Sequence, residues 1–373
     1  MTKPAMVYVS ESALPSARAN GVQIVQMCAA FSRQTRLCRL VYPRIEAGPA
    51  PVPSLSLYYG ETTGFVETPV ALARVRWRLP RLVRAVRRAC RESKPDLLYG
   101  RSPAAVLFTP NNARKGLEAH MVPARRLSLA GLLWELVNLH PAIRVVAISA
   151  ALRDRLIERY PRLHSRCLVE PSCGSLQDVR ETEPTHAAWA SLARRVIYCG
   201  SISRSKGLGV VVDAARALPF HHVTIVGGTP GEVQREVGGE LPKNLHCLGQ
   251  LSRAEIPPIL RDHGIALLPN QRVMVPYGGG GDIAAYNSPL KLFEYLANGN
   301  VVVASDMPNL REVLAADEAL WAAPDQVHQW TSSILRCADH AFALDLIRRG
   351  RTLIKTRYNW DARAARILEW LTA

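Results

Sequence analysis

The chain has 373 residues, of which 48% are hydrophobic and 21% charged, and this length suits two folded domains better than one. Its eight cysteines stand singly without a C-x-x-C pair, which argues against a disulfide framework or a zinc ribbon and favours a reducing compartment. The net charge of +16 is uneven, because residues 1–180 carry 27 Lys and Arg against 12 Asp and Glu, a difference of +15, whereas residues 181–373 carry 20 against 19.

The first apolar run, Ala5–Val9, predicts a strand, because it has neither the long apolar region nor the small-residue cleavage site of a signal peptide. No run approaches the roughly 18–20 apolar residues that a membrane-spanning helix needs. We therefore expect a protein that is soluble or lies on a membrane surface.

Short apolar runs alternate with helical patterns along the whole chain, which is typical of parallel sheets with crossover helices. The predicted strands of the first half are 6–9, 37–42, 55–58, 96–99, 117–120 and 145–148. Those of the second half are 196–198, 223–226, 245–247, 265–268, 301–304 and 319–321. The polar segment around Pro184 predicts a linker over 179–190, between an α/β domain over 1–178 and another over 191–356.

Much of the positive charge of the first half falls in residues 74–94, where nine basic residues accompany the single acid Glu92. Apolar residues interleave with the arginines, so the segment predicts a helix that is both cationic and amphipathic. A solvated helix face is the plainer interpretation, but the pattern favours an anionic membrane surface over nucleic acid, since no nucleic-acid-binding signature is present. The candidate membrane-side residues are Arg81, Arg84, Arg87 and Arg88.

Residues 287–299 form the segment with the clearest chemistry. Ser288 is a suitable N-cap, Pro289 suits the first helical position, and Gly299 suits the helix end, so we predict a helix over 289–298. It follows a predicted strand, so the free N–H groups of residues 288–291 point into the crevice at the carboxyl end of a parallel sheet, where a diphosphate would bind. Glu294, one turn further, could accept from both hydroxyls of a ribose or be an ordinary exposed glutamate.

A second candidate phosphate-binding element is the loop 200–208, which leaves the strand 196–198 and enters a helix predicted over 210–218. Lys206 at the mouth of that helix could neutralise a departing diphosphate. The loop contains neither a G-x-G-x-x-G nor a Walker A motif.

Together these segments resemble the C-terminal half of glycosyltransferase family 4. The resemblance is carried by residues 198–201 with Lys206-Gly207, by 225–228, by 248–250, and by the block 288–312 that contains Glu294 and Gly299. The first half is a looser match, over 17–23, 96–102, 118–120 and 146–149. The resemblance implies the GT-B fold, in which two Rossmann-like domains face a central cleft, the N-terminal one binding the acceptor and the C-terminal one the nucleotide sugar. The final segment, 357–373, would be a helix that crosses back to the first domain.

Carried over to this sequence, the resemblance implies that Lys206 contacts the diphosphate and Glu294 the ribose. The implied donor-binding residues are Gly21, Gly200, Ser201, Arg204, Lys206, Gly249, Gln250, Leu251, Ser288, Pro289, Leu290, Lys291 and Glu294. His120, after a strand in a Glu-x-His setting, would line the acceptor side and is the second catalytic candidate, although a lone histidine is more often structural. Two positions depart from the family: Ser201 stands where an arginine is common, and Tyr286 where a glutamate normally touches the donor sugar.

The resemblance thus implies a retaining glycosyltransferase (EC 2.4, hexosyltransferase type) that uses a UDP- or GDP-linked sugar and requires no cofactor and no metal ion. The acceptor would be lipid-linked or a growing cell-surface glycan, as in bacterial cell-envelope polysaccharide biosynthesis, and the enzyme would be cytoplasmic and peripheral on the inner face of the membrane. Two alternatives stay open: a nucleotide-sugar 2-epimerase of the same fold, and a catalytically silent nucleotide-binding scaffold.

Overall fold

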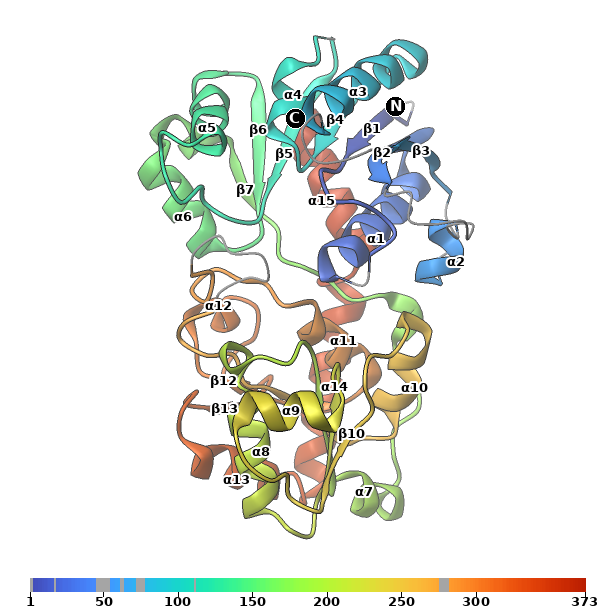
Figure 1. Cartoon of the computed structure of the whole chain (residues 1–373). Coiled ribbons are helices and arrows are strands. Elements are labelled where there is room, and N and C mark those ends of the chain that lie inside the picture. The colour runs from blue at the N-terminus through green and yellow to red at the C-terminus, as the bar shows by residue number, and fades with distance from the viewer. Residues whose placement is uncertain are drawn as a thin grey trace. The chain divides into compact units, whose positions relative to one another are not determined.

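A computed structural model describes residues 3–16, 18–44, 54–60, 64–71, 78–110, 112–274 and 282–373. The chain divides into two units, of which the first comprises Met1–Pro171 together with Trp360–Ala373 and the second comprises Ser172–Asn359 (Figure 1). Each unit is built on one parallel sheet. We call them the N-terminal and the C-terminal domain.

The N-terminal domain has a seven-stranded sheet in the order β3-β2-β1-β4-β5-β6-β7. Its strands are β1 Ala5–Val9, β2 Leu37–Arg44, β3 Val66–Ala71, β4 Leu97–Gly100, β5 Arg114–Ala119, β6 Ile143–Ala147 and β7 Cys167–Val169. The central strands β1 and β4 are fully buried, as their unbroken apolar sequences predict. The strand order reverses between β1 and β4, which is the Rossmann arrangement.

The prediction of a strand at 55–58 is wrong, because residues Leu55–Tyr59 form the short helix α2. The Ser54 hydroxyl caps its first turn, and Gly60 ends it in the left-handed conformation, so local capping decides a segment whose apolar pattern fits either structure. The edge strands β3 and β7 were not predicted. β3 contains Pro69 and is largely exposed, as a proline-containing edge strand can be.

Helices cover the sheet of the N-terminal domain on both sides. They are α1 Ala19–Gln34, α3 Arg78–Ser93, α4 Pro103–Phe108, α5 Leu129–Leu139, α6 Ala150–Arg159, the 3-10 helix η2 Pro161–Arg166, and α15 Trp360–Thr372. The last helix, α15, packs along α1, the red helix beside the blue one in Figure 1. On another part of the domain α4 packs between α3 and α5.

The C-terminal domain has a six-stranded parallel sheet in the order β10-β9-β8-β11-β12-β13, again reversing beside its first strand. The strands are β8 Arg195–Cys199, β9 His222–Val226, β10 Leu245–Cys247, β11 Ile265–Leu268, β12 Val301–Ser305 and β13 Leu320–Ala322. All six were predicted from the sequence, and their apolar side chains form the core with α8 and α13. The prediction of two Rossmann-like α/β domains is therefore confirmed.

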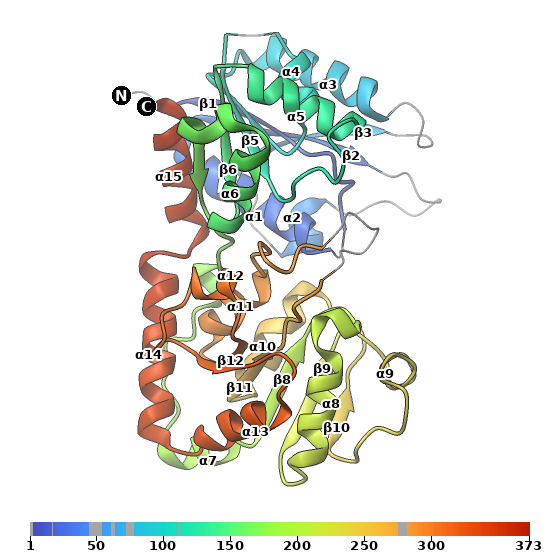
Figure 2. The same ribbon diagram turned by 90° about the vertical axis from the view of Figure 1, so that its left-hand side faces the viewer.

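The helices of the C-terminal domain are most easily followed in the view of Figure 2. They are α7 His186–Leu192, α8 Leu208–Ala217, α9 Pro230–Val237, α10 Ile256–Arg261, α11 Leu290–Asn298, α12 Pro308–Arg311, α13 Val327–Arg336 and α14 His340–Thr356, with the 3-10 helices η3 Leu176–Asp178, η4 Arg204–Lys206 and η5 Arg253–Glu255. The chain passes between the domains at Pro171/Ser172 and Asn359/Trp360. The segment 179–190, expected as a linker, lies inside the C-terminal domain, and α7 begins within it.

Candidate functional site

The C-terminal domain presents the expected donor residues at the carboxyl ends of its strands. In a doubly wound sheet the crevice for a ligand lies where the strand order reverses, here between β8 and β11. The loop from Gly200 to Lys206 follows β8, and the turn Gly249-Gln250-Leu251 follows β10. Helix α11 is joined to the same edge, because the backbone N–H of Cys199 at the end of β8 donates to the Tyr295 hydroxyl (2.9 Å).

Two lysines lie at this edge and repel one another. The Lys206 ammonium contacts the Met274 sulfur at 2.9 Å, and burial lowers the pKa of Lys206. The Lys291 ammonium lies over the Tyr198 ring, 4.4 Å from its centroid, and is buried with no hydrogen-bond partner among the described residues. Burial first, and the charge of Lys206 second, lower the pKa of Lys291 to about 7. Two partly buried lysines that form no ion pair among the described residues, with Lys291 in the first turn of α11, favour the binding of an anion.

Gly200 provides the room for this arrangement. A Cβ atom at that position would lie 2.7 Å from the Lys291 Nζ and 2.8 Å from the Tyr198 hydroxyl. Any larger residue would therefore displace the Lys291 ammonium from its place above the ring. The neighbouring Ser201 is exposed.

The start of α11 differs in detail from the prediction. The helix begins at Leu290 with Pro289 as its N-cap, so the predictions that Ser288 is the N-cap and Pro289 the first helical residue are wrong. The Ser288 hydroxyl instead accepts from the Ser172 N–H (2.9 Å), and the Ser172 hydroxyl donates to the Ser288 carbonyl (3.0 Å). These two bonds fix the approach to the helix. Its predicted end at Gly299, in the left-handed conformation, is confirmed.

Glu294 is held in an ion pair that the sequence did not indicate. One oxygen contacts the guanidinium of Arg253, whose other nitrogen binds Asp178 at 3.1 Å. The side chains of Arg253, Asp178 and Glu294 are each less than one-fifth exposed. Arg253 comes from η5, just after the turn Gly249-Gln250-Leu251, and so joins that turn to α11. Glu294 is therefore a positioned carboxylate rather than a freely solvated one.

Arg204 is engaged away from the two lysines. Its Nε donates to the Glu236 carbonyl at 2.7 Å, and a second nitrogen donates to the Val237 carbonyl, both at the last turn of α9. A cation is favourable there because it meets the negative end of the helix dipole. Gly249, in the left-handed conformation, exchanges backbone hydrogen bonds with Gly227 and Gly228 and thus ties the end of β10 to β9.

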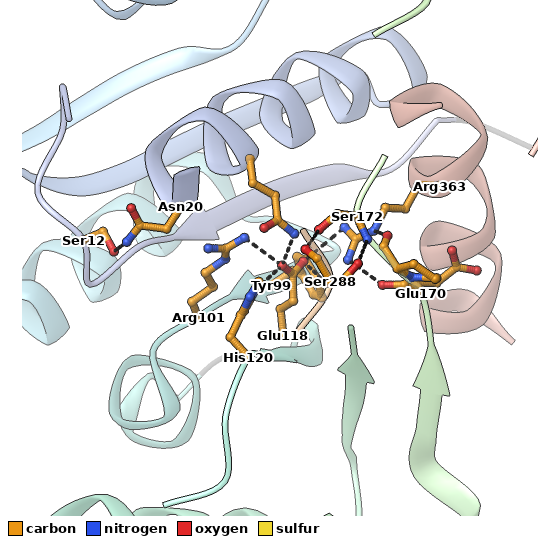
Figure 3. Close-up of polar contacts among 12 residues, drawn as sticks. Ser12, Asn20, Tyr99, Arg101, Glu118, His120, Glu170, Ser172, Ser288 and Arg363 are labelled. Atoms are coloured by element: carbon orange, nitrogen blue, oxygen red, sulfur yellow. Dashed lines mark hydrogen bonds and ion pairs between the residues drawn. The ribbon is translucent and has the colours of Figure 1, made fainter. Parts of the chain in front are cut away.

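In the N-terminal domain, the corresponding edge contains Gly21 and His120. Gly21 lies in the first turn of α1, after β1, where a Cβ would meet the Ser16 carbonyl at 3.0 Å. His120 follows β5, and its Nε2 lies 2.6 Å from Glu118 (Figure 3). Burial lowers the pKa of His120 to about 4. Because an ionised Glu118 can only accept, the neutral imidazole donates from Nε2 and keeps Nδ1 as an acceptor.

Glu118 is the centre of a buried network, and this network was not foreseen. Its carboxylate accepts hydrogen bonds from Tyr99 (2.8 Å), Arg101 (2.9 Å), Gln23 (3.2 Å) and Arg363 (3.3 Å). Neither the Glu118 nor the Arg363 side chain is exposed. Arg363 belongs to α15 and also donates to the carbonyls of Glu170 and Pro171. The Glu-x-His pattern was the available signal for Glu118, but its partner Arg363 stands 245 residues away.

Helix α3 exposes the four arginines that were expected on the membrane side, Arg81, Arg84, Arg87 and Arg88. Residues 74–77 lie outside the described residues. The fully buried side chains of α3, among them Leu82 and Val86, face its own domain, where the helix packs on β1 and β2. This apolar face is therefore not available to a membrane, and only the cationic face and its margins are.

Comparison with protein families finds a match that lies within the C-terminal domain. Residues 193–340, less than half of the chain, match the family described as Glycosyl transferases group 1. The amylovoran biosynthesis glycosyltransferase AmsK of Erwinia amylovora is 26% identical over 174 residues, which are 44% of this chain and only 41% of that protein.

Solved structures resemble the whole chain at low sequence identity. HepE from Anabaena, in complex with UDP and glucose, has a TM-score of 0.72 at 15% identity, with 99% of this chain and 100% of that chain covered. WaaG, a glycosyltransferase involved in lipopolysaccharide biosynthesis, has a TM-score of 0.66 at 12% identity, with 99% and 100% covered. The chain therefore has the two-domain GT-B fold, and its C-terminal domain carries the sequence pattern of the group 1 glycosyl transferases.

Proposed function

We propose that this protein is a glycosyltransferase that moves a sugar from a nucleotide diphosphate to an acceptor, with retention at the anomeric carbon. The observation that carries the proposal is the pair Lys206 and Lys291 beside the N-terminus of α11, in a domain whose sequence matches group 1 glycosyl transferases. Two partly buried lysines suit a departing diphosphate, whose negative charge grows as the glycosidic bond breaks. Glu294, positioned by Arg253, would bind the ribose.

The donor we propose is a UDP-linked sugar, since HepE was solved with UDP and glucose. The acceptor we propose is lipid-linked or a cell-surface glycan, since AmsK and WaaG serve polysaccharide and lipopolysaccharide biosynthesis. In the N-terminal domain, neutral His120 would face the acceptor or the donor sugar, with Glu118 holding its ring.

The test is release of nucleotide diphosphate from a panel of UDP- and GDP-sugars, with and without lipid-linked acceptor. Acceptor-dependent release is expected, and a thermal-shift screen of the same panel selects the donor because a ligand of the native state raises the melting temperature. Conversion of the sugar without acceptor would instead indicate the epimerase. Binding without any turnover would indicate the silent scaffold.

Glu294→Ala is expected to weaken nucleotide-sugar binding by about 1.5–3 kcal/mol, because the ribose loses a charged hydrogen-bond acceptor. Calorimetric titration measures the dissociation constant of the nucleotide sugar. Glu312→Ala, which removes the glutamate at the end of α12, serves as the matched control. An unchanged dissociation constant in the Glu294 variant would remove this residue from the donor site.

Nucleotide-sugar binding is expected to weaken as pH rises through about 7. Burial and Lys206 lower the pKa of Lys291 to about 7, so its ammonium is already losing its proton there, whereas a bound diphosphate favours the charged form. Binding therefore takes up a proton above that pH, and affinity falls by up to about tenfold per pH unit. Lys291→Met should bind more weakly with a flat profile between about pH 6 and 8.5, and an equally steep profile in that variant would contradict the assignment.

A further inference from the structure

Helix α5 carries an apolar stripe on its outer face. Four leucines along it are 44–66% exposed, and Leu127, just before the helix, is 87% exposed. They are Leu129, Leu132, Leu136 and Leu139. At about 100° per residue these four fall within an arc of about 80°, so they form one continuous stripe.

The opposite face of α5 is also apolar, since Leu133, Trp134 and Val137 are buried in the domain. The single charged residue of the helix, Glu135, lies between the two faces and is paired with Arg126 at 3.0 Å. A helix that is hydrophobic all round is usually buried on all sides. Here one side has no cover within the described part of its domain, and exposed apolar patches of this kind mark interaction surfaces.

The charges beside the stripe indicate what covers it. The layer α3–α4–α5 contains six arginines on α3 but two acids, Glu92 and Glu135, and both acids are already paired with arginines. Within that layer α4 lies between α3 and α5 (Figure 1). Between α3 and α4 runs a hollow of about 420 Å³ lined by Leu79, Pro80, Val83, Ala104 and Phe108 together with Arg84 and Arg87.

We propose that this layer docks on an anionic lipid bilayer, with the α5 leucine stripe inserted among the acyl chains and the α3 arginines at the headgroups. Leucines beside arginines are the composition of helices that lie in a membrane interface. The hollow suits a lipid, because its apolar side chains could contact an acyl chain while the guanidinium groups of Arg84 and Arg87 bind an acidic headgroup. A second copy of the chain is a poorer occupant, because it would repeat the excess of arginine and bring no unpaired acid from this layer.

The proposal goes beyond the proposed function and does not require the transferase reaction. No helix within the described ranges is long and apolar enough to cross a membrane. Docking through α5 would be interfacial, because its 11 residues, at about 1.5 Å each, are far too short to span a bilayer. The leucines rather than the arginines would supply the part of the binding that salt does not screen.

The experiment measures partition of the full chain onto vesicles with 30% anionic phospholipid, at low and at high salt. Replacing Leu129, Leu132, Leu136 and Leu139 by glutamine should reduce binding at least tenfold at both salt concentrations. Replacing Arg81, Arg84, Arg87 and Arg88 by glutamine should reduce it chiefly at low salt. The matched control is Phe220→Gln with Leu335→Gln, which removes apolar side chains 82% and 53% exposed in the other domain and should leave binding unchanged.

Folding of each variant is checked by its melting temperature and by its thermal shift with nucleotide sugar, so loss of the donor site is distinguished from loss of the membrane site. Leu136→Trp in the otherwise unchanged chain provides a second measurement, a blue-shifted emission on adding vesicles. Parent-like partition of the leucine variant, or no spectral shift, overturns the proposal. So does conversion of a dimer to a monomer by the leucine changes without any effect on vesicle binding.

Discussion

Glu118→Ala is expected to lower the free energy of unfolding of the N-terminal domain by about 3–5 kcal/mol, as removing one partner of a buried ion pair does. Arg363 is fully buried and Arg101 nearly so, and the substitution leaves both guanidinium groups without the carboxylate between them. Chemical denaturation followed by circular dichroism measures the loss. The loss of stability arises because two buried guanidinium groups keep their charge without a counter-ion, and not only because side-chain volume is lost. Glu118→Gln should therefore also destabilise the domain.

The stability that Glu118 gives to the N-terminal domain is expected to decrease at low pH. Burial opposes ionisation of Glu118, but Arg363 and Arg101 hold its pKa well below the usual value. A carboxylate with a depressed pKa stabilises the fold above its ordinary pKa near 4.5, and that contribution is lost as pH falls through the folded value. The parent should therefore lose this contribution in acid, whereas the alanine variant has none to lose.

Glu92→Ala is the matched control in the same domain. Glu92 also binds two arginines, Arg88 and Arg39, but its side chain is 44% exposed, so the loss of stability should be small beside that of Glu118→Ala. Equal destabilisation by the two substitutions would contradict the view that the buried network, rather than ion pairing in general, stabilises this domain.

The sequence predicted the sheet of the C-terminal domain almost completely, because each strand is a short apolar run set off by turns or helices. It failed at 55–58, where a capping serine and a glycine outweigh the apolar pattern, and at the edge strands β3 and β7, which lack a continuous buried run. Residues that are close in sequence, such as Leu290 to Glu294, could be assigned to one helix. The exact N-cap could not, because Ser172, which engages Ser288, lies 116 residues away.

The missed contacts share one physical reason: they join segments that only the folded chain brings together. Arg253 reaches Glu294 across 41 residues, and Arg363 reaches Glu118 across 245. The α5 stripe was missed for a different reason. A helix composed mainly of Leu, Ala, Trp and Val is predicted from its sequence to be buried in the core. Only the exposure of its leucines in the structure shows that one face is uncovered.

Lys206→Ala is expected to lower kcat by about 10²–10³-fold, the usual cost of removing one donor that stabilises developing negative charge. The Lys206 ammonium is largely buried against Met274 and is near enough to Lys291 to depress the pKa of that lysine. Because charge on the leaving diphosphate grows toward the transition state, the lysine should bind that state more strongly than the ground state.

Donor affinity in Lys206→Ala should accordingly change less than tenfold, since Lys291 and the N-terminus of α11 still attract the diphosphate. Steady-state kinetics with saturating acceptor and calorimetric titration of the nucleotide sugar separate the two quantities. Lys243→Ala, which removes an exposed lysine before β10 in the same domain, should leave both near parent values. If Lys206→Ala reduced affinity as much as turnover, the lysine would contribute binding alone, and if it changed neither, the departing diphosphate would have to lie elsewhere in the fold.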